Sequence, residues 1–160
     1  MRAALELICK RLNGLAEKLL ILLIAVTVLA VTAQVIFRYG IESSLTWSEE
    51  VSRYAFIWSI FIGTSVATRR NQHIIVDAFV KTLPASLQRW LGIANLAICG
   101  AFFVLFAYVS VLLVQNAIPQ KSSSLEISIA WVYASAVLGA LLTVLHLLNA
   151  LVQRRPGQPQ

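Results

Sequence analysis

Residues 90–153 carry only two charged side chains, Lys121 and Glu126. Placing a Lys, Arg, Asp or Glu side chain at the centre of a bilayer costs at least about 2.5 to 3.5 kcal/mol, so such a run is typical of hydrocarbon surroundings. The whole sequence is 59% hydrophobic and 12% charged, which is more apolar than soluble domains. The sequence therefore predicts an integral membrane protein.

Four apolar segments can cross a hydrocarbon core of about 30 Å as helices of about 20 residues. They cover residues 16–37, 47–68, 90–118 and 127–152. We expect an all-α fold, with a single four-span membrane domain over residues 1–153, short interfacial helices such as residues 74–83, and a short cytoplasmic tail at residues 154–160. These spans leave no room for a soluble catalytic domain, so an enzyme is not expected.

The basic residues indicate the orientation of these spans. Of the thirteen Lys and Arg residues, only Arg38, Arg53 and Lys121 fall on the side opposite the termini. By the positive-inside rule, both termini are expected to be cytoplasmic. The others are split among three segments next to the membrane, which argues against a nucleic-acid partner. Residues 19–33 could also be the apolar part of a signal peptide, but the apolar run continues to Phe37 and favours a retained span.

The second span is short and has a charged end. Residues 46–49, Thr-Trp-Ser-Glu, fit the capping-box pattern that starts a helix. The uncharged part, residues 54–68, is about 22 Å long at 1.5 Å per residue. We expect the first turns to lie in the headgroup region, with Arg53 close enough to pair with Glu49 or Glu50. Capping and ion pairing are the favoured roles of these carboxylates, and proton coupling is the alternative.

Small residues recur along one face of two spans. They are Ser52, Ala55, Ser59, Gly63 and Ala67 in the second span, and Ser135, Gly139 and Thr143, followed by His146, in the fourth. Such faces predict close contact between helices, because small side chains let backbones approach in lipid.

No motif for local chemistry is present. The sequence has no phosphate-binding loop, no HExxH and no Cys/His cluster, so neither ATP hydrolysis nor a metal site is expected. Cys9 and Cys99 are expected too far apart in depth to form a disulfide. His73 and His146 are expected at unlike depths, so no haem or other cofactor is predicted, and a satisfied polar contact is the favoured role of His146.

One block of residues has a distinctive order. It comprises Arg38, Tyr39, Trp47, Glu49, Glu50, Arg53, Trp58, Gly63, Arg70, His73 and Asp77. This order resembles the signature of the small membrane subunit, the Q subunit, of tripartite ATP-independent periplasmic (TRAP) transporters. Residues 124–127, Trp131, Tyr133 and Gly139 are similar to the start of the family's fourth helix. The chain departs from the family where proline is expected, near Ser128 and Ser135.

The resemblance implies a multi-pass protein of the bacterial inner membrane. In this family a periplasmic binding protein delivers an organic acid, such as a C4-dicarboxylate or a sialic acid. A large M subunit carries it inward with a sodium gradient, and the Q subunit is a scaffold packed against M. The eleven residues of the block would then contact a partner, or would be anchors at the lipid surface, as aromatic and charged residues at helix ends commonly are.

Two other classes of protein fit four spans. A self-sufficient four-helix exporter would use a carboxylate embedded in its first span for proton exchange, and residues 19–37 contain none. A membrane assembly protein unrelated to transport is the other alternative.

Overall fold

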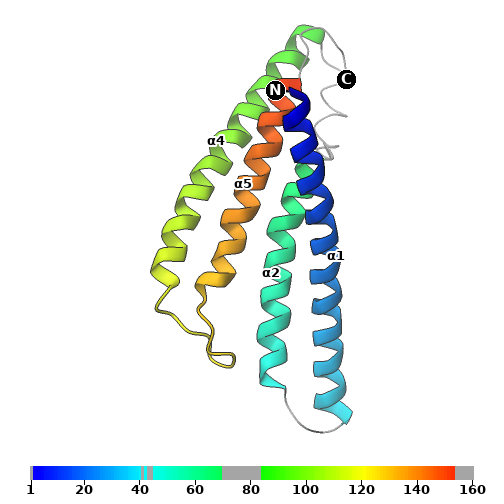
Figure 1. Cartoon of the computed structure of the whole chain (residues 1–160), viewed down its shortest axis with the longest axis vertical. Helices are drawn as coiled ribbons and strands as arrows, with labels where there is room; N and C mark the ends of the chain where they lie inside the picture. The colour runs from blue at the N-terminus through cyan, green and yellow to red at the C-terminus, as the bar shows by residue number, and fades with distance from the viewer. Residues whose placement is uncertain (1, 41, 43–44, 70–83, 154–160) are drawn as a thin grey trace.

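The computed structural model describes the chain except for residues 1, 41, 43–44, 70–83 and 154–160. Four helices make up nearly all of the described part (Figure 1). They are α1 (Arg2–Gly40), α2 (Thr46–Arg69), α4 (Ala85–Ala117) and α5 (Ala130–Gln153). The predicted all-α fold is confirmed, and α2 begins where the capping-box pattern predicted. The interfacial helix predicted at residues 74–83 lies outside the described residues.

Three of these helices are long and apolar enough to cross a membrane, over Glu6–Gly40, Trp90–Ala117 and Ala130–Leu151. Helix α2 is not among them, because charged residues lie near both of its ends and hydroxyl side chains are spread along it. Helix α1 has 39 residues, which is about 58 Å at 1.5 Å per residue and about twice the thickness of a hydrocarbon core. Its amphipathic N-terminal part continues into the apolar part without a break.

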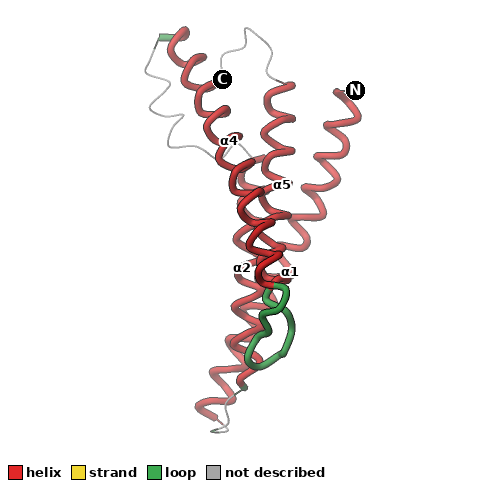
Figure 2. The backbone as a smooth tube through the Cα atoms, turned by 90° about the vertical axis from the view of Figure 1, so that its left-hand side faces the viewer, coloured by secondary structure: helices red, strands yellow, loops and turns green. Residues whose placement is uncertain are grey.

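The helices lie side by side in the order α4, α5, α2, α1 (Figure 1) and form one layer toward the α4–α5 loop, whereas at the opposite end they fan apart (Figure 2). Helix α2 packs on both α1 and α5, whereas α4 packs mainly on α5. Seen from the side, the lower halves of the helices overlap in a narrow band (Figure 2). We call the end with the α4–α5 loop the loop end, and the end where α1 starts and α5 stops the terminal end. A single layer leaves both of its broad faces open to lipid or to a partner.

Small and hydroxylated side chains fill the contacts between helices. Ser65 and Ser135 are fully buried, and their hydroxyls donate to carbonyls one turn earlier in their own helices, at 2.8 Å and 2.6 Å. This bonding satisfies the hydroxyl inside one helix and leaves its small bulk for packing against another.

The predicted packing face of α5 is confirmed, since Ser135, Gly139, Thr143 and His146 are all buried. On α2 the prediction holds for Ser52, Ala55 and Ser59, which are buried, but Ala67 is exposed. A helix with 3.6 residues per turn rotates a strict four-residue repeat gradually away from the contact. The buried face of α2 therefore continues through other residues, namely Ile62, Ser65 and Val66.

Candidate interaction site

The side chain of Glu50 fastens the α4–α5 loop to the first turns of α2. Its carboxylate accepts hydrogen bonds from the Ser122 hydroxyl at 2.7 Å, the Ser124 amide at 2.9 Å and the Leu125 amide at 3.0 Å. Glu50 is only 6% exposed, so its burial depends on these donors. The two amides bind different carboxylate oxygens, and an amide N–H can only donate. The arrangement therefore favours the ionised carboxylate.

The loop that Glu50 holds is a short hairpin-like turn between α4 and α5. Lys121 and Ser128 form an antiparallel bridge, and the Ser122 amide donates to the Ile127 carbonyl at 2.9 Å. Glu126 adopts a left-handed backbone conformation, with φ of 54°, where the turn reverses. The bridge orders the base of the loop, and Glu50 binds the amides at its tip. Ser122 therefore belongs to the site. The sequence did not distinguish it from the other serines of the same turn.

Arg53 does not form the ion pair expected from its spacing. Among the described residues no ion pair joins it to Glu49 or Glu50; its guanidinium lies 5.8 Å from the centre of the Tyr54 ring. The oxygens of Glu50 are engaged by the loop, whereas Glu49 and Arg53 are exposed. An exposed pair of this kind contributes little, so spacing alone is not sufficient to form it. The expected pairing is therefore wrong, and Arg53 faces outward.

The other predicted site residues near the loop end are exposed on two helices. Arg38 lies in the last turn of α1, followed by Tyr39, which is 78% exposed. Trp47 lies in the first turn of α2 and is half-exposed. Their exposure is compatible with contact to either lipid or protein.

Two predicted site residues lie between α1 and α2 instead. Trp58 packs against a cluster formed by Ala16, Ile62 and Val66. A side chain added at Gly63 would meet Leu20 at 3.7 Å, an ordinary packing distance. Trp58 and Gly63 therefore take part in joining α1 to α2.

A second polar contact lies near the terminal end. The guanidinium of Arg69 donates through Nη1 to the carbonyl of Cys9 at 3.0 Å and to that of Lys10 at 3.4 Å. This contact could not be predicted from the sequence, because carbonyl acceptors on another helix leave no signal there. The predicted site residues Arg70, His73 and Asp77 lie outside the described residues.

At mid-length, Phe61 links α2 to α4 across α5. Its backbone lies against Gly139, where an added Cβ would sit 2.7 Å from the Phe61 carbonyl oxygen. The ring of Phe61 stacks on that of Phe106 of α4, with centroids 5.9 Å apart. Phe106 in turn stacks on Phe102 at 6.0 Å. The glycine permits the close approach of α2 and α5, and the aromatic rings bridge α2 and α4.

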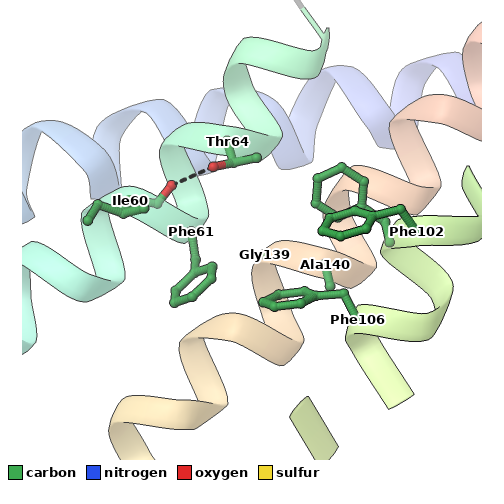
Figure 3. A pocket seen from close by; sticks show the side chains of 8 residues that line it. Ile60, Phe61, Thr64, Phe102, Phe106, Gly139 and Ala140 are labelled. Atoms are coloured by element: carbon green, nitrogen blue, oxygen red, sulfur yellow. Dashed lines mark hydrogen bonds between the residues drawn. The ribbon is translucent and has the colours of Figure 1, made fainter. Parts of the chain in front are cut away.

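An apolar groove of about 210 Å³ opens beside these rings (Figure 3). Phenylalanine rings of α2 and α4 form its walls, and two small residues of α5 form its floor. The lining residues are Ile60, Phe61, Thr64, Phe102, Phe103, Phe106, Gly139 and Ala140. The Thr64 hydroxyl donates to the Ile60 carbonyl at 2.9 Å, so the groove demands no polar partner.

Two buried polar atoms lack partners among the described residues, His146 Nδ1 and Asn13 Oδ1. A satisfied polar contact was expected for His146 from the sequence. The residue is buried, with an exposed fraction of 4%, but its Nδ1 has no partner among the described residues. Within the described ranges, no three His, Cys, Asp or Glu side chains come together as metal ligands, and Cys9 and Cys99 are free. The side chains described in this subsection join helices to one another and pack between them.

The family described as "Tripartite ATP-independent periplasmic transporters, DctQ component" matches residues 27–157 of this chain. A Haemophilus influenzae protein named as a TRAP transporter small permease is 40% identical over 73 residues, 46% of this chain and 45% of the relative. The Vibrio cholerae C4-dicarboxylate TRAP transporter small permease DctQ is 29% identical over 93 residues, 58% of this chain and 40% of the relative. The chain thus matches less than half the length of each of these two relatives.

A third relative is much longer than this chain. The Haemophilus influenzae sialic acid TRAP transporter permease SiaT is 24% identical over 118 residues, which are 74% of this chain and 19% of the relative. A segment similar to this chain is therefore continuous with a larger permease in that protein.

Proposed function

The chain belongs to the DctQ component family of TRAP transporters, and from this premise we propose that it is a scaffold that holds a large permease subunit in the membrane. It is a multi-pass small permease subunit of the bacterial inner membrane. The match over residues 27–157 carries the proposal, because it includes α2, α4, α5 and the loop that Glu50 holds. In this role the chain works by binding, not by catalysis.

The single layer of helices supports a scaffold role. Each broad face of the layer leaves apolar side chains open, and α2 is not apolar enough to be a candidate span by itself. A helix of this kind is better accommodated against protein than against lipid, because helix contacts in membranes tolerate small and hydroxylated residues. Glu50 and Arg69 fasten α2 to neighbouring segments at its two ends and so give the layer a fixed shape.

The partner that we propose is a large TRAP permease. SiaT supports it, because a segment like this chain is joined to a larger permease within one polypeptide. The periplasmic binding protein is the second partner in the proposal, meeting the complex at the loop end. This placement rests on the distribution of basic residues, from which we expect both termini in the cytoplasm.

The substrate class that we propose is an organic acid carried with a sodium gradient. Relatives are named for C4-dicarboxylate and for sialic acid, which are chemically distinct carboxylates. We assign the choice between such substrates to the large permease and the binding protein, since the Phe61 groove and the hollow beside Trp131, within the described residues, are lined without a cationic side chain.

Co-expression tests the proposal. A tagged form of the chain is purified from membranes that also contain a co-expressed large TRAP permease. We expect the two proteins to copurify in fixed ratio, and we expect uptake of a labelled organic acid into proteoliposomes only when both permeases, the binding protein and a sodium gradient are present.

The exporter alternative gives the opposite result in the same system. Proton-driven efflux of a cationic dye by the purified chain alone would contradict the scaffold role. Failure of the large permease to copurify with the wild-type chain would contradict it as well.

A further inference from the structure

The register of three helices is fixed by close contacts at mid-length. Helix α1 runs antiparallel to α2 and to α5 (Figure 1). Leu20 of α1 packs at Gly63 of α2, and the backbone of Phe61 of α2 lies against Gly139 of α5. Helices α1 and α5 also contact each other directly. The height of any residue on these three helices can therefore be compared by counting from the contacts.

Counting brings Asn13 and His146 to the same height near the terminal end. Asn13 lies seven residues from Leu20, and His146 lies seven residues from Gly139, both toward the terminal end. The two contact points on α2 from which these steps start are two residues apart, which is about 3 Å at 1.5 Å per residue. The side chains of Asn13 and His146 thus lie at nearly the same level of the layer.

Both side chains are on the buried faces of their helices. Asn13 is 7% exposed and shares its face with Cys9 and Ala16, which are buried as well, and His146 is 4% exposed. Arg69 of α2 donates to the carbonyl of Cys9, one turn before Asn13, and its charge acts on the imidazole of His146. Asn13, Arg69 and His146 therefore meet where α1, α2 and α5 come together, and we call this place the terminal junction.

Each of the two buried side chains has a polar atom that lacks a partner among the described residues. Asn13 Nδ2 donates to Glu17 at 2.7 Å, whereas Asn13 Oδ1 can only accept and receives no hydrogen bond within the described part of the chain. His146 Nδ1 donates or accepts, depending on the tautomer. Burying such atoms without a partner is unfavourable, so the terminal junction calls for a ligand that bonds to both.

The chemistry of the terminal junction selects a neutral ligand. The positive charge of Arg69 disfavours a cation there, and Asn13 Oδ1 disfavours an anion because it has no proton to donate. A molecule that can both donate and accept suits Asn13 Oδ1 and either tautomer of His146 Nδ1. Both side chains are more than nine-tenths buried, so the ligand must also be small. Water meets all of these conditions, and buried waters commonly have at least two polar partners.

The terminal junction also lies where water is near. His146 is five residues from Leu151, the end of the candidate span of α5, which is about 8 Å at 1.5 Å per residue. Asn13 lies on the terminal side of the exposed Lys18, outside the uncharged run of α1 at residues 19–37. A water molecule from the headgroup region therefore has a short path to both atoms.

We propose that an ordered water molecule occupies the terminal junction, donating a hydrogen bond to Asn13 Oδ1 and sharing a second one with His146 Nδ1. This water joins α1 to α5, and the hydrogen bond from Arg69 to Cys9 joins α2 to α1 beside it. All three helices are thus connected by polar contacts at this end. The inference concerns the chain itself and does not depend on the partner proposed above.

Water-edited solid-state NMR of the isotope-labelled wild-type chain in lipid bilayers tests the site directly. Magnetisation is transferred from water protons and read at the side chains of Asn13 and His146. Ala16 is the matched control, since it is equally buried, lies one turn from Asn13 and has no polar side-chain atom. We expect the signals of Asn13 and His146 to build up at least about threefold faster than that of Ala16. Equally slow build-up at all three residues would overturn the proposal.

A substitution on α5 tests whether the two atoms share one water. His146→Phe keeps an aromatic ring and removes Nδ1, so we expect transfer to Asn13 to slow by at least about threefold. Thr143→Val is the control, because the Thr143 hydroxyl already donates to the Gly139 carbonyl at 2.8 Å, and it should leave transfer to Asn13 unchanged. Unchanged transfer to Asn13 in His146→Phe would show that no water joins the two side chains.

Stability gives a second readout that differs in sign between a hydrated and a dry junction. If water bonds to His146 Nδ1, His146→Phe removes a hydrogen bond and should lower the ratio of folded to unfolded protein about tenfold. If Nδ1 is buried without a partner, the apolar ring removes an unfavourable group and the ratio should rise. Unfolding by a denaturing detergent measures the ratio, and a variant at least as stable as wild type would overturn the proposal.

Discussion

The backbone of Phe61 occupies the space that any side chain at residue 139 would need. A Cβ at Gly139 would lie 2.7 Å from the Phe61 carbonyl oxygen and 2.9 Å from its carbonyl carbon. These are backbone atoms of a helix, so they cannot rotate away as the end of a flexible side chain would. The closest approach of α2 to α5 therefore depends on glycine at this position.

We expect Gly139→Ala to destabilise the protein by about 1–2 kcal/mol, because the overpacking cost exceeds the gain in helix propensity. Thermal unfolding in detergent, followed by circular dichroism, measures the effect. Gly100→Ala is the matched control, since a Cβ there meets nothing within 4 Å, and this variant is expected to be neutral or slightly stabilised. Equal behaviour of the two variants would show that α2 and α5 are not in close contact at residue 139.

The three hydrogen bonds that Glu50 accepts from the α4–α5 loop, which we call the Glu50 clasp, predict a local effect on the loop. In Glu50→Gln the amide group keeps one acceptor oxygen and loses the other, so it cannot accept from both Ser124 and Leu125. We expect the amides of Ser124 and Leu125 to exchange hydrogen faster by about tenfold, in line with one lost hydrogen bond to a charged group. Hydrogen exchange measured by mass spectrometry reports this change.

Glu49→Gln is the control for the clasp, since Glu49 is exposed and the loop contacts are made by Glu50. It is expected to leave exchange in the loop unchanged. Equal acceleration in both variants would point to a general effect of net charge and would argue against the clasp.

The aromatic bridge predicts a measurable coupling between two helices. A double-mutant cycle of Phe61→Leu and Phe106→Leu should give about 0.5–1.5 kcal/mol, the usual value for a stacked pair beyond its buried area. Unfolding by a denaturing detergent supplies the free energies. The same cycle with Phe103 in place of Phe106 should give a coupling near zero, because Phe103 contacts the ring of Phe102 on its own helix. A coupling of equal size in both cycles would contradict the bridge.

From the hydrogen bonds that Arg69 donates to α1, we predict an effect on stability and on helix separation at the terminal end. Arg69→Met removes the donor to the carbonyls of Cys9 and Lys10 and keeps most of the apolar length of the side chain. We expect a loss of about 1–2 kcal/mol and wider separation of α1 and α2 near residue 9. Spin labels on α1 and α2 near that end, read by pulsed electron resonance, measure the separation. Lys10→Met is the control and should change neither quantity; an unchanged separation in Arg69→Met would refute the contact.

The helices were predictable from sequence because charge avoidance and small-residue faces are properties of the chain itself. The buried face of α5 was predicted from its small residues, and the start of α2 at Thr46 was predicted from a capping-box pattern. The same reasoning could not find the partner of Glu50, since a carboxylate three residues from an arginine suggests a pair by spacing. The donors of the loop lie more than seventy positions away and are mostly backbone amides.

The role of Phe61 shows the same limit at mid-length. Phe61 lies within residues 47–68, a span that the sequence predicted. Its contact with Phe106 depends on the height at which α4 passes α5, which side-chain packing and the α4–α5 loop determine together. A single sequence contains no record of that height, so the groove could not be predicted.

The order of synthesis determines when the Glu50 clasp can form. Translation releases Glu50 before its partner Ser122, which lies 72 positions later in the chain, so the carboxylate enters the membrane surface before any of its three donors has been made. Until α4 and the loop have been inserted, this carboxylate must stay in contact with water or with the insertion machinery. Closure of the clasp therefore accompanies completion of the last hairpin, and a chain truncated before residue 122 retains an unsheltered acidic group near the start of its second helix.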